Sequence, residues 1–429
     1  MTVRVRDKAP GNATCDAASP FCVAEWRASD QRFFTEWVTG LGAAGRTPLH
    51  PVLQTFQREV EKDPQLLAQF NRMFRQVPHA PPYDRDPTGR PQARNFSHML
   101  DMINAVLRSP PAFNQTGLTG LPINAIVDWS MATDAGHAVF LNPLVNHHLK
   151  CILNQWALFL ASPASLPALS DDPASGWFGA AAMAKMPHFD AEFESDRTLP
   201  YRGFRSWDDF FTRRFRPGVR PVSAPDDDAV IVNACESAPY RLGRGVRLRD
   251  RFWVKAQPYS IEQMLAGDQR AACFAGGTVY QAFLSSFSYH RWHSPVAGLV
   301  VKTQVIAGTY YAQTRGAGYD PCGPRRSQAY ITQVATRALI FIQADHPGIG
   351  LMCFVAVGMA EVSTCDISVS AGQRVQKGQQ LGMFHFGGST HCLLFRPETL
   401  LDFDLGGASP GLDAGPIKVN ALIATVRAG

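Results

Sequence analysis

The chain has 429 residues, of which 45% are hydrophobic and 18% are charged, so it carries enough apolar material for a large core and more chain than one core usually holds. We therefore expect two domains, and we exclude a disordered or fibrous protein. The 41 basic and 36 acidic residues leave a net charge of +5, a mild excess that gives no reason to expect a nucleic acid as partner.

Apolar residues at spacings of three and four predict helices in the first half. One helix runs from Pro51 to Val60, and a second follows Asp63, which is placed to cap it, and Pro64, which suits the first helical position. Similar patterns cover residues 97–107 and 144–160. We predict an N-terminal extension over residues 1–29 and a helical domain over residues 30–200.

Short β-rich runs separated by glycine turns replace this pattern after the acidic turn at Asp226-Asp227-Asp228. They cover residues 277–283, 298–305, 338–342 and 350–357, and their spacing is typical of packed antiparallel sheets. We predict an α+β protein whose residues 201–429 form a mainly antiparallel β domain, sandwich-like or barrel-like. The stretch 311–330, rich in glycine and proline, predicts a long loop that is either a lid or a plain surface insertion.

Cysteine usage and hydropathy indicate the cellular compartment of the protein. The nine cysteines are scattered and include no C-x-x-C pair, which disfavours a disulfide framework and a zinc ribbon. The most apolar helical stretch, residues 151–160, is too short to cross a bilayer, and residues 1–20 hold no apolar run typical of a signal peptide. We expect a cytoplasmic protein without stable membrane insertion.

Two segments in the β half carry candidate chemistry. In Gly387-Gly388-Ser389-Thr390, Gly388 has no Cβ, so the Ser389 hydroxyl can approach the preceding carbonyl as self-cleavage requires, although such a segment alone is more often a tight turn. In Tyr289-His290-Arg291-Trp292-His293, either histidine can act as a general acid or base, or be a hydrogen-bonded structural residue. Residues three apart on a strand face opposite sides, so we expect that His290 and His293 have different tasks or that they lie where the strand bends. No further ligands with suitable spacing lie nearby, and we expect no metal site.

Four segments, taken in order, resemble the phosphatidylserine decarboxylase family, whose members cut themselves before a serine and convert it into a pyruvoyl group. These are Phe211–Val222 with the pattern F-x-R-x-x-x-P-G-x-R-P, Lys255 with Tyr259-Ser260-Ile261, Tyr289–Gly298, and the Gly-Gly-Ser-Thr segment. Further segments in both halves, among them Gly176-Trp177-Phe178 and Ala234-Cys235-Glu236-Ser237, resemble the soluble tryptophan-decarboxylase branch of the family in fungi.

This resemblance implies a function and a set of roles. The chain would be cut between Gly388 and Ser389, and its fragments 1–388 and 389–429 would stay associated. The pyruvoyl group derived from Ser389, without pyridoxal phosphate or metal, would form a Schiff base with an aromatic L-amino acid, best matched by L-tryptophan, and release CO2 and the amine. His293 would be the processing base, oriented by Glu236, and His290 would act on the substrate carboxylate or reprotonate Cα. Since phospholipid enzymes carry an aspartate at the position of Glu236, a structural pairing with an arginine is the alternative for this residue.

The substrate side chain would need an apolar, aromatic-lined pocket. Phe384, Phe386, Trp292 and Tyr310 are the candidates, and packing in the β core is at least as good an interpretation of all four.

Two other functions stay open. One is a phosphatidylserine decarboxylase that makes phosphatidylethanolamine at a membrane surface. The other is a binding module, because residues 369–382 resemble the hairpin of biotinyl and lipoyl carrier domains, although no carrier lysine at a hairpin tip follows. The oligomeric state is also open, a homo-oligomer included.

Overall fold

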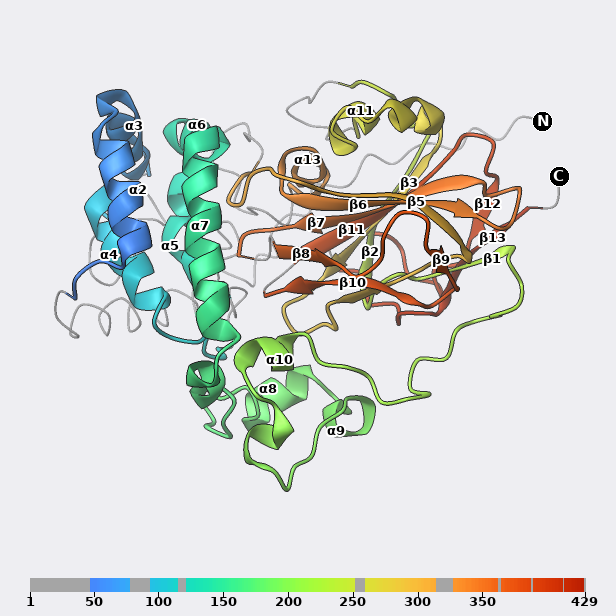
Figure 1. Cartoon of the computed structure of the whole chain (residues 1–429), viewed down its shortest axis with the longest axis horizontal. Coiled ribbons are helices and arrows are strands. Elements are labelled where there is room, and N and C mark those ends of the chain that lie inside the picture. Colours follow the sequence, from blue (N-terminus) through green and yellow to red (C-terminus); the bar gives the residue numbers. More distant parts are fainter. Residues whose placement is uncertain are drawn as a thin grey trace, which may run out of the picture.

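The computed structural model describes residues 47–77, 93–114, 121–250, 259–313, 327–361, 364–386, 389–411 and 413–427. Within these ranges, helices occupy the first half of the chain and antiparallel sheets the second, as Figure 1 shows. This arrangement confirms the predicted α+β class. The predicted N-terminal extension, residues 1–29, lies outside the described residues.

The first two described helices begin where the sequence predicts. They are α2 (Pro51–Glu61) and α3 (Pro64–Arg75). The Asp63 carboxylate accepts the backbone N–H groups of Gln65 and Leu66 at 2.9 and 3.1 Å, and Pro64 stands at a position whose N–H would have no helical partner. The buried side chains are those of the predicted apolar stripes: Leu53, Phe56, Val60, Leu66, Phe70, Met73 and Phe74.

The remaining helices of the first half pack around a core rich in aromatic rings. They are α4 (Phe96–Val106), α5 (Pro122–Met131), α6 (Asp134–Leu141), α7 (Pro143–Leu160), η2 (Pro163–Ala168), α8 (Ala180–Lys185), α9 (Phe189–Glu192), η3 (Pro200–Gly203) and α10 (Trp207–Phe211). Every residue of α5 after Pro122 is buried. Figure 1 shows α5 and α7 beside the strand ends of the β region, so this helix surface closes one end of the sheets.

The second half supplies the strands. They are β1 (Val230–Val232), β2 (Ala238–Arg244), β3 (Thr278–Leu284), β4 (Arg291–His293), β5 (Gly298–Ile306), β6 (Arg337–Ala344), β7 (Leu351–Gly358), β8 (Thr364–Ile367), β9 (Arg374–Val375), β10 (Gln380–His385), β11 (Ser389–Phe395), β12 (Leu401–Phe403) and β13 (Leu422–Val426). Among the described residues, they form a seven-stranded sheet in the order β2-β3-β11-β7-β6-β5-β9 and two three-stranded sheets in the orders β4-β10-β8 and β1-β13-β12. The four predicted β runs correspond to β3, β5, β6 and β7.

The large sheet is covered on both faces. On one face lies the β4-β10-β8 sheet, where the Trp292 and Phe354 rings meet with centroids 5.6 Å apart. On the other lie α11 (Ile261–Met264), η4 (Gln269–Phe274) and α13 (Gln328–Val334), visible above the sheet in Figure 1. The β region is therefore an open sandwich and not a closed barrel.

The predicted loop over residues 311–330 differs from expectation at its end. Residues 314–326 lie outside the described residues, but α13 begins at Gln328. The segment Gln328–Val334 contains no glycine or proline and buries Ala329 and Ile331 against the sheet, so packing favours a helix there.

Candidate active site

Ser389 is the first residue of β11, a central strand of the large sheet. It is fully buried, and its backbone pairs with Leu284 of β3 and Gly358 of β7. Among the described residues, none hydrogen-bonds the Ser389 Oγ atom. Buried hydroxyls are usually paired, so this position suits a group that reacts. Gly388, the other side of the predicted cleavage site, lies outside the described residues.

A buried chain of hydrogen bonds holds the residue after Ser389. The Thr390 Oγ1 donates to the Ala282 carbonyl at 3.0 Å and accepts the Gln281 Nε2 at 3.1 Å. The Gln281 Oε1 in turn accepts the Tyr259 hydroxyl at 2.7 Å. Tyr259 belongs to one of the four segments of the sequence analysis, so this relay links that segment to the predicted cleavage segment.

His293 ends β4 with both ring nitrogens engaged. Its Nδ1 lies 2.7 Å from the Gly378 carbonyl oxygen and its Nε2 lies 2.8 Å from the Tyr289 hydroxyl. Because the carbonyl can only accept, Nδ1 carries the proton and Nε2 accepts from Tyr289. Burial lowers the pKa of His293 below 6.5, with the Gly378 contact acting against it, so the ring is neutral at pH 7.

His290 lies three residues earlier and nearer to the end of β10 that leads to Ser389. Its carbonyl accepts the Phe384 N–H at 2.9 Å, whereas His293 pairs with Gln380 at the opposite end of β10. The His290 ring is fully buried and stacks on Phe211, with centroids 3.9 Å apart. The structure thus gives the two histidines different surroundings and places His290 closer along the strand to the predicted cleavage segment.

Glu236 has partners other than His293. Its Oε1 accepts the Arg220 Nη2 at 2.7 Å and its Oε2 accepts the Val419 N–H at 2.7 Å. Arg220 also binds Glu192 at 2.8 Å. Among the hydrogen bonds of the described residues there is none between Glu236 and His293, so the direct contact expected from the resemblance is absent and the arginine pairing is what the structure shows.

The four pocket candidates divide into two groups. Trp292 and Phe384 are fully buried in the sandwich core, where their rings meet edge to face at 4.8 Å. Phe386 and Tyr310 belong to the core of the helical region, and Phe386 contacts the Trp156 ring at 4.5 Å. Only this second pair lies where the helices meet the sheet end that carries Ser389.

Two buried titratable residues near Ser389 escaped the sequence analysis. His391 lies two residues along β11 and therefore on the same face of the sheet. Burial lowers the pKa of His391 to about 3, and among the described residues neither ring nitrogen has a hydrogen-bond partner. The alternation of strand residues from Ser389 onward was the signal that could have found it.

Glu361 is the second such residue and follows β7. Its Oε1 accepts the Asn124 N–H, at the N-terminus of α5, at 2.8 Å. Burial raises the pKa of Glu361 to about 8, against the lowering effect of this hydrogen bond. A lone acid directly after a buried apolar run was the signal in the sequence.

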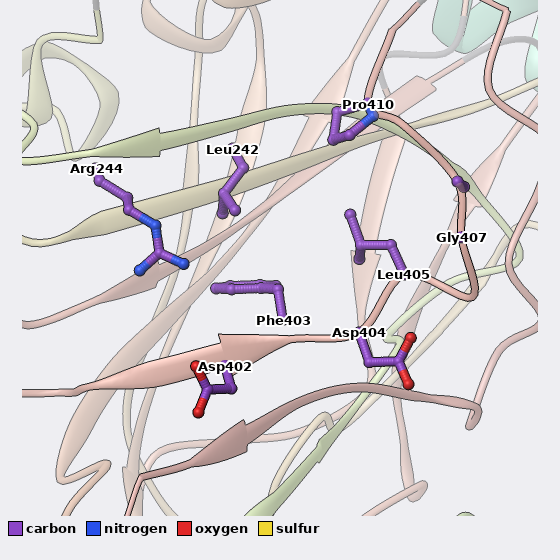
Figure 2. A pocket seen from close by; sticks show the side chains of 9 residues that line it. Leu242, Arg244, Asp402, Phe403, Asp404, Leu405, Gly407 and Pro410 are labelled. Atoms are coloured by element: carbon purple, nitrogen blue, oxygen red, sulfur yellow. The ribbon is translucent and has the colours of Figure 1, made fainter. Parts of the chain in front are cut away.

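A separate pocket of about 500 Å³ opens at the edge of the β region. Figure 2 shows Leu242, Phe403 and Leu405 around it, and the Arg244 Cζ lies 5.7 Å from the centroid of the Phe403 ring. None of the predicted site residues lines this pocket, so it is not the site of the chemistry predicted at Ser389.

The described residues have two further properties. They contain no group of three or more histidine, cysteine, aspartate or glutamate side chains that could hold a metal ion. They also contain no helix long and apolar enough to cross a membrane.

Comparison with known proteins gives the family. Two family models described as phosphatidylserine decarboxylase match residues 50–186 and 207–408. The decarboxylase iboD of Amanita muscaria is 43% identical over 76% of this chain and 99% of its own length. An L-tryptophan decarboxylase of Psilocybe cyanescens is 34% identical over 96% of both chains, and a phosphatidylserine decarboxylase proenzyme of Chlamydia trachomatis is 31% identical over 49% of this chain and 66% of its own length.

The four ordered segments, the α+β fold and these matches agree with one another. Proteins of the matched family are decarboxylases whose cofactor is a covalently bound pyruvoyl group, and a buried serine at the first residue of a central strand fits a cofactor made from the chain itself. The chain belongs to the phosphatidylserine decarboxylase family and is a carboxy-lyase.

Proposed function

We propose that this protein is a self-processing, pyruvoyl-dependent decarboxylase that converts an aromatic L-amino acid, L-tryptophan in our assignment, into its amine and CO2. The observation that carries the proposal is the position of Ser389, buried at the start of β11 with no hydrogen-bond partner for its Oγ among the described residues. The choice of substrate rests on the similarity to proteins named L-tryptophan decarboxylase, which extends over 96% of both chains in one case.

In the proposed processing step, the Ser389 Oγ loses its proton to a base and attacks the carbonyl carbon of residue 388. The peptide bond becomes an ester, and the nitrogen of residue 389 becomes a free amine. Loss of the Cα proton of residue 389 then expels the carboxylate of residue 388 and leaves a dehydroalanine. Water hydrolyses this group to a ketone and releases ammonia, which yields fragments 1–388 and 389–429.

The base in this step is one of the two histidines of the β4 segment. The resemblance assigns processing to His293, which is neutral at pH 7 because burial lowers its pKa, but whose Nε2 already accepts from Tyr289. The pairing of His290 with Phe384 places that histidine nearer to the cleavage segment. We propose that both histidines act at this site and that single substitutions distinguish their roles. His293→Asn should abolish cleavage, whereas His290→Asn should leave cleavage intact but stop turnover. The reverse outcome would exchange the two assignments.

The role proposed for Glu236 is indirect. Glu236 does not hydrogen-bond His293, but it binds Arg220 and the backbone N–H of Val419. It also lies near Tyr289: burial raises the pKa of Tyr289 most, and Glu236 adds to this shift. We propose that Glu236 holds Arg220 and the backbone at Val419 in place, and that the Tyr289 hydroxyl orients the His293 ring.

The pyruvoyl ketone would supply the electron sink that loss of CO2 requires. Once processing is complete, the chain itself would keep bulk water away from residue 389, which is fully buried, and would hold the adjacent backbone through Thr390, Gln281 and Tyr259. The apolar ring of the substrate would lie toward Phe386 and Tyr310 at the junction of helices and sheet.

One experiment tests the proposal. The purified protein is incubated separately with L-tryptophan, L-phenylalanine, L-tyrosine and phosphatidylserine vesicles, CO2 release is measured, and intact mass is recorded before and after reaction with borohydride and substrate. We expect two polypeptides, 1–388 and 389–429, the smaller without a free amino group, and CO2 from tryptophan. Ser389→Ala should remain a single chain without activity.

The alternative is a phosphatidylserine decarboxylase, favoured by the similarity to proenzymes of that name over about half of the chain, 49% in one case. Release of CO2 from the lipid alone would establish it. A single uncut chain that nevertheless decarboxylates an amino acid would contradict the self-processing mechanism.

A further inference from the structure

The helices meet the end of the large sheet in a small buried group of polar side chains, Asn124, Asp128, Tyr311 and Glu361, which we name the acceptor cluster. All four residues are at most 3% exposed. The Glu361 Oε1 accepts the Asn124 N–H at 2.8 Å, and the Asn124 Nδ2 lies 3.5 Å from the Asp128 Oδ1. Tyr311 belongs to the same group, because the carbonyl of its neighbour Tyr310 accepts the N–H of Ala360, the residue before Glu361, at 3.0 Å; burial first and Glu361 second raise the pKa of Tyr311.

The acceptor cluster holds more hydrogen-bond acceptors than donors. Within the described part of the chain, the Asn124 Oδ1, the Glu361 Oε2 and the Tyr311 hydroxyl have no hydrogen-bond partner. The two N–H groups of Asn124 named above already point to carboxylates. Buried polar atoms are normally paired, so this arrangement is suited to a ligand that brings an N–H donor.

The acceptor cluster lies close to the reacting residue. Gly358, the last residue of β7, is the backbone partner of Ser389, and Glu361 follows it by three residues, or at most about 11 Å of chain. Ala360 between them has a φ of 54°, a conformation that costs a non-glycine residue energy, and its N–H donates to the Tyr310 carbonyl at 3.0 Å. In Figure 1, the helices α5 and α7 lie on the side of the β region where β7 is labelled, and the hydrogen bond from Asn124 to Glu361 joins α5 to the chain that follows β7.

We propose that the acceptor cluster is the subsite for the substrate side chain and that Glu361 accepts a ring N–H, so the enzyme selects amino acids whose side chain carries an N–H donor over those with a hydrocarbon ring. The inference rests on the proposed function and adds a specificity-determining residue to it. A hydrocarbon ring would leave the acceptors buried and unpaired. Sites built for a hydrogen bond reject such analogues more strongly than an apolar pocket rejects a change of size.

The test compares kcat/KM for L-tryptophan, 1-methyl-L-tryptophan and L-phenylalanine at pH 9, because burial raises the pKa of Glu361 to about 8 and only the ionised carboxylate offers its Oε2 as an acceptor. 1-Methyl-L-tryptophan keeps the indole ring and lacks only its N–H. The wild-type protein should prefer tryptophan over both analogues by about 10- to 100-fold. Glu361→Gln should bring these ratios close to one, because its Oε1 must still accept the Asn124 N–H and its amide then presents a donor to the substrate donor.

Two controls make the result specific. Glu398→Gln carries the same chemical change at an exposed position and should keep the wild-type ratios. Intact mass should show both fragments in every variant, which separates a change of selectivity from a failure to mature. If Glu361→Gln does not fold or mature, Tyr311→Phe carries the test, with an expected loss of selectivity of about 3- to 10-fold for removal of one hydroxyl.

Unchanged ratios in Glu361→Gln, or in Tyr311→Phe where it replaces that variant, would overturn the subsite, as would a wild-type protein that accepts 1-methyl-L-tryptophan as well as L-tryptophan. If a mature protein turns over no aromatic amino acid, the proposed substrate is wrong. The subsite is then tested on a panel of glutamine, arginine, histidine, leucine and methionine. A preference for side chains with N–H that Glu361→Gln removes supports it, and a preference for hydrocarbon side chains refutes it.

Discussion

The raised pKa of Glu361 predicts how the stability of the protein depends on pH. Burial holds the pKa at about 8 in the folded state, against 4.5 for the ordinary side chain. Below pH 4.5 both states are protonated and the stabilising contribution of the proton is complete. Between pH 4.5 and 8 the unfolded chain ionises while the folded protein keeps its proton, so the free energy of unfolding falls as the pH rises. Of the polar groups around this carboxyl, Asn124 donates its N–H to it, Asp128 lies beyond Asn124 and is bonded to the Asn124 amide, and Tyr311 has its pKa raised by burial and by Glu361.

The size of the effect follows from the shift. Each pKa unit corresponds to about 1.4 kcal/mol, so the loss across this window is at most about 5 kcal/mol. Such a loss is a large part of the free energy of unfolding of a typical domain, which is about 5–15 kcal/mol. Glu361→Gln cannot ionise, so its free energy of unfolding should lack this component, and the variant should become the more stable protein at high pH.

The assay is the urea midpoint between pH 4.5 and 9, measured in a Ser389→Ala background so that both states are one chain. With glutamate at position 361, the urea midpoint should fall between pH 4.5 and 8, and with Glu361→Gln it should change less. Glu398→Gln, which alters an exposed residue, should keep the pH profile of the protein with glutamate at 361. If the urea midpoints of the proteins with Glu and with Gln at position 361 change in parallel with pH, the reasoning is refuted, because the Glu361 carboxyl would then ionise normally in the folded protein.

Further expectations concern the cut bond and its surroundings. Fragments 1–388 and 389–429 should coelute in gel filtration and separate only in strong denaturant, because the shorter one carries strands β11 to β13; separation in plain buffer would contradict the described sheet. Thr390→Val removes the end of the buried relay and should slow cleavage by roughly tenfold, as one lost buried hydrogen bond of about 1–2 kcal/mol implies, measured by the time course of fragment formation. His391→Leu should resist acid better than the wild type, because the lowered pKa of His391, about 3, makes wild-type stability fall as the pH drops from 6.5 toward 3; equal urea midpoints at pH 4 would argue against it.

Local patterns predicted the fold well where packing and capping agree with them. The Asp63 cap, the Pro64 start and the apolar stripes of α2 and α3 are all present, because each depends on residues within one or two turns. The runs that correspond to β6 and β7 were found for a similar reason, since strands buried on both faces are nearly continuous apolar segments. The order of strands in the sheet could not be predicted, because pairings such as β11 with β3 and β7 join residues about a hundred or several tens of positions apart.

The same physical reason limits how far the site can be predicted from the sequence. Motif residues such as Ser389 and the two histidines can be recognised locally, whereas their partners come from elsewhere in the chain. Glu236 illustrates the limit: a carboxylate next to a buried strand can serve an imidazole or a guanidinium, and only the fold brings Arg220 to it. Glu361 was missed because its meaning depends on Asn124, 237 residues away.

The position of the proposed cut explains how a broken chain can keep a rigid centre. Ser389 is the first residue of β11, so a break before it costs the strand only the N–H of residue 389, which leaves with the ammonia, and the residues from Thr390 to Phe395 stay paired on both sides. The strand is also buried along its whole length, which makes its withdrawal costly even without a covalent link. A break within β11 would instead free two short strands at the middle of the sheet. The proposed cleavage at the strand's beginning would therefore place a new chain terminus, and the ketone proposed there, at an end of β11, where the chemistry can change while the sheet that holds it stays intact.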